Sequence, residues 1–158
     1  MRCVMLFGSK CEERFGELEQ QLRHAHAPTP GITANVVGEA CARFGSQSPA
    51  AKARLDRLVE SGAWTEASLV LVELELPQWK LRRLIYDDGE WFCSLSKQPR
   101  LPVGLDEVAE ASHEVMPLAI LIALLEAQRV AASSGTDVSV VPRVRPWPGY
   151  EVCCDSFG

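Results

Sequence analysis

The sequence lacks the short motifs that mark most catalytic sites. It has no glycine-rich phosphate loop, no Gly-x-Ser-x-Gly nucleophile elbow, no His-Glu-x-x-His zinc motif and no Cys-x-x-Cys pair. It also has little of what such sites are built from, with 3 histidines and 7% aromatic residues. We therefore predict no catalytic residue, no metal site and no cofactor, and the sequence favours a protein that is not an enzyme.

The chain also lacks an excess of basic residues and a long apolar run. Lys and Arg number 16 against 21 Asp and Glu, which makes nucleic acid an unfavourable partner. The longest apolar run, LAILIALL at 118–125, is short of the roughly 20 residues that cross a bilayer, so we expect no membrane association. The opening MRCVMLF is too short for a signal peptide. We expect a cytoplasmic protein with reduced thiols.

What is present is an ordinary globular composition. The 158 residues are 47% hydrophobic and 23% charged, as expected for one α+β domain with a real core. We predict N-terminal helices, a three-stranded antiparallel β-meander and a proline-kinked hydrophobic C-terminal helix packed on the sheet. Within the single domain 1–158, these parts occupy 1–62 (mainly helical), 68–96 (meander), 106–132 (kinked helix) and 142–158 (extended tail).

Capping signals predict three helices before the sheet. Ser9 and Glu12 fit a capping box that opens a helix over about 10–24. A linker at 27–32 and a second helix over about 34–44 follow. Ser48 is the predicted cap of the third helix, which ends at Gly62.

The meander is predicted from alternating apolar residues. Residues 69–76 alternate at period two, and Pro77 then turns the chain into a second strand at 79–86. A two-residue loop there places Glu75 opposite Lys80 and Leu74 opposite Leu81.

The second turn, Asp87-Asp88-Gly89, is open to two interpretations. A two-residue loop pairs Tyr86 with Trp91, whereas a three-residue loop pairs Ile85 with Trp91. The choice decides which face of the sheet the aromatic side chains of the third strand join.

The C-terminal region predicts a helix interrupted by proline. Asp106 is the predicted cap of a segment that reaches about residue 115. Pro117 either kinks one long helix or lies in the first turn of a new one. The apolar run at 118–125 then belongs to the core under the sheet or to an oligomer interface, and we favour the core. An edge strand is predicted at 138–141.

Two groups of residues are candidates for function. The first is an aromatic and basic contact surface. Arg83 is predicted on an apolar face with Leu81 and Ile85, so its charge must be paired, stacked on an aromatic ring or exposed at a margin of the sheet. The members of this surface are Trp79, Arg82, Arg83, Tyr86 and Trp91. The second is an ExxH pair on the predicted helix, Glu110 and His113, which would form a pocket beside the proline.

These features lead to three functional hypotheses. The first is a small protein-interaction or regulatory protein with a protein partner, or one that assembles as a homo-oligomer. The second is a small-ligand-binding protein or enzyme that uses Glu110 and His113. The third is helix-turn-helix DNA binding through residues 34–61, with Lys52, Arg54 and Arg57 facing the duplex.

Overall fold

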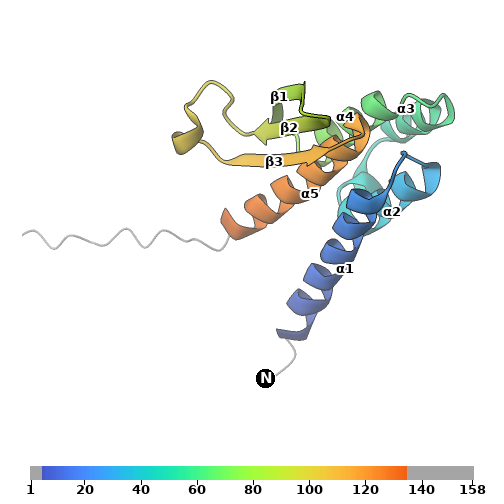
Figure 1. Ribbon diagram of the computed structural model, residues 1–158. Helices are drawn as coiled ribbons and strands as arrows, with labels where there is room; N and C mark the ends of the chain where they lie inside the picture. Colours follow the sequence, from blue (N-terminus) through green and yellow to red (C-terminus); the bar gives the residue numbers. More distant parts are fainter. Residues whose placement is uncertain (1–4, 135–158) are drawn as a thin grey trace, which may run out of the picture.

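The computed structural model describes residues 5–134 of the 158-residue chain (Figure 1). These residues form five α-helices and a three-stranded antiparallel sheet, with the C-terminal helix packed on the sheet. The predicted α+β fold class is confirmed. The predicted strand at 138–141 and the tail at 142–158 lie outside the described residues.

The first two helices begin before the predicted residues. The capping box predicted at Ser9 and Glu12 is wrong, because both residues lie inside the first helix, and the second helix ends at Ala40 rather than near residue 44. Helix α1 spans Met5–His24, and α2 spans Pro30–Ala40. Helix α2 begins four residues before the predicted start, because Thr29 accepts a hydrogen bond from the backbone of Ile32 and Pro30 fits the first turn. Part of the predicted linker at 27–32 is therefore helical. A short 3-10 turn, η1 (Phe44–Ser46), follows.

Helix α3 spans Pro49–Glu60 and has both of its predicted caps. The Ser48 hydroxyl accepts a hydrogen bond from the backbone N–H of Ala51 at 3.3 Å. At the other end Gly62 has φ +73°, and the N–H groups of Gly62 and Ala63 bond the carbonyls of Val59 and Leu58. This pair of bonds is a Schellman motif, which requires the left-handed conformation that glycine adopts without strain.

The predicted first strand, residues 69–76, is wrong: residues 69–75 lie in helix α4, Trp64–Glu75, and Leu76 is its C-cap. The helix packs against both α3 and α5, so it buries side chains on most of its circumference. Its exposed glutamates, Glu66 and Glu73, are two helical turns apart. They lie on one face, so a helix covered from two sides keeps only a narrow polar stripe, and its apolar residues then imitate the alternation of a strand.

The sheet follows α4 and is a meander of β1 (Lys80–Asp87), β2 (Glu90–Ser96) and β3 (Val108–His113) in spatial order β1-β2-β3. Strand β3 occupies the segment that was predicted to begin the kinked helix. Asp106 does not cap a helix, and alternate residues of β3, Ala109, Ala111 and His113, are buried. The small alanines let helix α5 approach the sheet. Between β2 and β3 the chain makes a 3-10 turn, η2 (Val103–Leu105).

Helix α5 spans Met116–Ser134 and packs against β3, β2, α4 and α1 (Figure 1). Pro117 lies in its first turn, the second of the two alternatives, so the predicted kink is absent. In the described part of the chain, α5 is the one helix long and apolar enough to cross a membrane. Its apolar side chains from Leu118 to Leu125 are all buried in this fold, so packing accounts for its composition.

Candidate functional site

The five residues of the predicted contact surface do not form one surface. Trp79 is 3% exposed and lies in the core just before β1, with the Lys97 ammonium 5.6 Å from its ring centre. Trp91 is half-buried beside the exposed ring of Tyr86, at a centroid distance of 5.2 Å. Arg82 contacts Asp106, and Arg83 lies on the opposite face of the sheet from Tyr86 and Trp91, as described below.

A β-bulge separates the two arginines. The pairing of β1 with β2 shifts between Leu81 and Arg83, which leaves Arg82 as the extra residue. The Arg82 guanidinium lies 3.2 Å from the carboxylate of Asp106. Burial alone would raise the pKa of Asp106, but hydrogen bonds from Ser96 and the Gln98 backbone, with the charge of Arg82, outweigh it and lower the pKa. Because of the bulge, Arg83 no longer shares a face with Leu81.

The hairpin between β1 and β2 fixes the faces of β1. Tyr86 pairs with Trp91 and Asp87 with Glu90, which is the two-residue loop of the two alternatives. The loop residues Asp88 and Gly89 have φ +49° and +87°, the signs that a type I′ turn requires. Leu84 and Tyr86, opposite Cys93 and Trp91, therefore face the α5 side. The opposite, outer face of the sheet carries Arg83, Ile85 and Asp87.

Strand β1 is an edge of the sheet. In residues 5–134 its only strand partner is β2, so its other edge is unpaired in this part of the chain. Among the described residues, most exposed large hydrophobic side chains lie there: Leu81, Ile85 and Tyr86 are 41%, 43% and 60% exposed, and the other one is Leu105. An unpaired edge is a template for pairing with another strand, although the charged side chains and the bulge of β1 are features that limit such pairing.

The hairpin also determines which backbone groups of β1 point outward. In a β-turn the carbonyl of the first residue faces the N–H of the fourth, so the backbone of Asp87 faces Glu90. Along an antiparallel strand, successive residues direct their N–H and C=O groups alternately toward one side of the strand and toward the other. The N–H and C=O groups of Leu84 and Tyr86 therefore point away from β2, toward the unpaired edge. This β1 edge, residues 83–87, offers a further strand both hydrogen-bonding groups and apolar side chains.

The two residues of the predicted pocket lie on opposite faces of β3. Glu110 is exposed, whereas His113 is 8% exposed on the α5 side. The predicted ExxH geometry is wrong, because three residues along a strand reverse the direction of the side chain.

His113 nevertheless lines a cleft of about 340 Å³ between the end of α1 and the end of β3. His24 and His26 line it too, so all three histidines of the chain meet there. The His113 ring is fully engaged: Nδ1 accepts the Val115 N–H at 2.9 Å, so the proton of the neutral ring is on Nε2, 3.3 Å from the Arg23 carbonyl. The ring therefore joins β3, α5 and α1. No group of three or more His, Cys, Asp or Glu side chains among the described residues is arranged to hold a metal ion.

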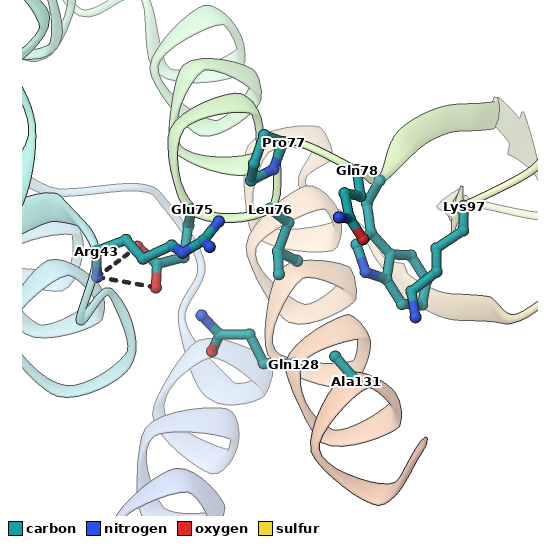
Figure 2. A pocket seen from close by; sticks show the side chains of 9 residues that line it. Arg43, Glu75, Leu76, Pro77, Gln78, Lys97, Gln128 and Ala131 are labelled. Carbon is teal, nitrogen blue, oxygen red and sulfur yellow. Dashed lines mark hydrogen bonds between the residues drawn. The ribbon is translucent and has the colours of Figure 1, made fainter. Parts of the chain in front are cut away.

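A second cleft, of about 410 Å³, lies where α4 ends and β1 begins (Figure 2). Both carboxylate oxygens of Glu75, a 6% exposed residue, accept the backbone N–H of Arg43, at 3.2 and 3.1 Å. Lys97 lies on the opposite wall (Figure 2). Its ammonium group is 5.6 Å from the centre of the Trp79 ring. Gln128 donates to the Ala40 carbonyl at 2.6 Å. The lining of this cleft includes two basic side chains, Arg43 and Lys97, and two side-chain amides, Gln78 and Gln128. The lining residues come from distant parts of the chain, so no local motif signals the cleft.

Cys41 and Cys93 are free and buried. Burial raises the pKa of each thiol to about 12, with a further contribution from the Glu75 charge at Cys41. Neither has the acidic thiol that a nucleophile requires.

Two basic residues of the predicted DNA-binding segment, 34–61, donate hydrogen bonds to backbone carbonyls of the same segment. Lys52 donates to the Gly45 carbonyl at 3.0 Å, and Arg57 donates to the Ala53 carbonyl at 3.3 Å. Arg54 is exposed.

Comparisons with protein-family models, with curated proteins and with solved structures found no match. Function is therefore argued from the arrangement of the residues themselves.

Proposed function

We propose that the protein is a protein-interaction module that binds its partner by adding a strand at the β1 edge. The observation that carries the proposal is the combination of outward-pointing backbone groups at Leu84 and Tyr86 with the exposed side chains of Ile85 and Tyr86. In strand addition the backbone hydrogen bonds supply affinity and the alternate side chains supply specificity. The β1 edge offers both in the same five residues.

The alternative sites have weaker support. Both nitrogens of His113 already have hydrogen-bond partners, and Glu110 lies on the other face of the sheet, so the predicted pocket pair does not converge on a ligand. DNA binding through residues 34–61 stays a prediction, and the backbone hydrogen bonds of Lys52 and Arg57 weaken it.

The proposal is tested by photo-crosslinking in cells of the host. A benzophenone amino acid replaces the exposed Tyr86, and in a matched variant it replaces the exposed Arg54 on α3. Under the proposal, irradiation gives a protein adduct at position 86 and not at position 54. Adducts at neither position would contradict the proposal, and adducts at position 54 alone would direct attention to the α2 and α3 surface.

A further inference from the structure

The charges of β1 run from basic to acidic along the strand. Lys80, Arg82 and Arg83 lie in its first half, and Asp87 ends it. Asp87 pairs with Glu90 within the hairpin, and like charges placed opposite each other destabilise a strand pair. A strand that brings a cation to Asp87 would relieve this repulsion. A second copy of β1 running antiparallel does so, because it places the basic half of one strand beside the acidic half of the other.

We propose that the partner at the β1 edge is a second copy of this chain, paired antiparallel about a two-fold axis at Ile85. This inference rests on the proposed function and names its partner. In this register Ile85 lies opposite Ile85 of the second copy, and Leu84 lies opposite Tyr86 of the second copy. Arg83 lies opposite Asp87 of the second copy on each side of the axis. The two sheets join into one sheet of six strands.

The backbone of β1 is compatible with this register. Leu84 and Tyr86, whose N–H and C=O groups point outward, form the pairs that exchange two backbone hydrogen bonds. Ile85 forms the intervening pair without hydrogen bonds, in which the side chains approach closest.

The faces of the sheet agree as well. A two-fold axis perpendicular to the sheet keeps each face on its own side. Arg83, Ile85 and Asp87 all lie on the outer face, so each meets a residue of its own face. Leu84 and Tyr86 likewise meet on the α5 side.

The neighbouring registers that preserve the faces are less favourable. Shifting the axis to Leu84 places Arg83 opposite Ile85 of the second copy and brings the bulged Arg82 opposite Tyr86. Shifting it to Tyr86 places Asp87 opposite Ile85. Both shifts leave Arg83 without a carboxylate opposite it, so the register centred on Ile85 is the one that pairs the charges.

The chain's own C-terminal segment is a poorer fit for the same edge. The apolar residues at 138–141 are flanked by Asp137 on one side and Pro142 on the other. Arg143 and Arg145 follow the proline. With Asp137 opposite Arg83, however, neither arginine falls opposite Asp87, because Arg83 and Asp87 are four residues apart and Asp137 is six and eight residues from these arginines. A second copy satisfies both Arg83 and Asp87.

Charge exchange tests the inference by sedimentation velocity over a range of concentrations of the full-length chain. Arg83→Asp and Asp87→Arg each replace two opposite-charge pairs per dimer with like-charge pairs. From typical energies of cross-strand pairs, we expect each single change to raise the dimer dissociation constant about tenfold or more. The double variant restores both pairs in reversed order and should return the constant to within about threefold of the original. Arg54→Asp, on the exposed face of α3, changes the net charge by as much as Arg83→Asp does. It should leave the dimer dissociation constant unchanged.

Each other result overturns the inference. A dimer that is insensitive to the single changes, or that the double change does not restore, would show that the chains associate elsewhere. A wild-type chain that is monomeric at all concentrations, but gives adducts with another protein at position 86, would overturn the self-pairing and leave the proposed function standing. A monomer without any adduct at position 86 would overturn both.

Discussion

Replacing Gly89 by alanine tests the turn on which the geometry of the β1 edge depends. Gly89 has φ +87°, and a Cβ atom built on it meets no atom within 4 Å. The cost therefore comes from the backbone conformation alone, which is about 1–2 kcal/mol for a residue with a side chain in the left-handed region. We expect the free energy of unfolding to fall by about 1 kcal/mol, since alanine also restricts the unfolded chain.

The assay is urea unfolding followed by tryptophan fluorescence and by circular dichroism. Gly38→Ala, at an exposed and unobstructed position inside α2, is the matched control. It should raise the free energy of unfolding by about 0.5–1 kcal/mol, because alanine is favoured over glycine in a helix. If Gly89→Ala stabilised the protein as Gly38→Ala does, the loop would not be a type I′ turn, and the assignment of outward-pointing groups on β1 would fail.

Three further predictions concern the core and the clefts. Cys41 and Cys93, whose pKa values are about 12, are thiolates to only about one part in ten thousand at pH 8, so peptide mapping should show them unmodified by iodoacetamide until the chain is unfolded. Glu75→Ala removes the acceptor of a buried backbone N–H and should lower the free energy of unfolding by about 1–3 kcal/mol, with a smaller loss for Glu75→Gln. His113→Phe leaves the Val115 N–H unpaired and should cost about 1–3 kcal/mol in the same urea assay; no loss would mean that the ring does not join the three elements.

The parts of the fold that were predicted correctly depend on local chemistry. The helix that begins at Pro49 was identified by a serine cap, a first-turn proline and a terminal glycine, each of which acts within a few residues. The chain reversal at 87–89 was identified for the same reason, because Gly89 can adopt the positive φ that such a turn requires, but the choice between a two-residue and a three-residue loop stayed open.

The errors fall where packing against distant residues decides the structure. Residues 69–75 are helical because α3 and α5 cover them from two sides, and neither contact can be read from the local sequence. Strand β3 has alanines and glutamate, which favour helices when isolated, but it gains the ladder with β2 and burial under α5. The sequence did contain the alternation at Ala109, Ala111 and His113 that is typical of a strand. The helix was predicted instead because Asp106 resembled a helix cap.

The candidate site was predicted in composition but not in geometry. The sequence identified the cluster of aromatic and basic residues around β1, including Arg83 and Tyr86. It did not show the bulge at Arg82, nor that the Arg82 side chain binds the carboxylate of Asp106, a residue 24 positions away. In a strand without the bulge, Leu81 shares a face with Arg83, Ile85 and Asp87. The sequence alone therefore does not show that these three residues form a self-complementary set.

The most direct test of the central claim, pairing of β1 with a second copy about Ile85, is disulfide trapping of Ile85→Cys under mild oxidation. Two such residues would form a directly opposed pair without hydrogen bonds, with Cα atoms about 4.5 Å apart, within the range that a disulfide spans. We expect a covalent dimer whose peptides are linked through position 85, and none through position 87 in the control Asp87→Cys, which in this register faces Arg83. Two results would contradict the account. One is a dimer of Asp87→Cys linked through position 87. The other is that both cysteine variants stay monomeric.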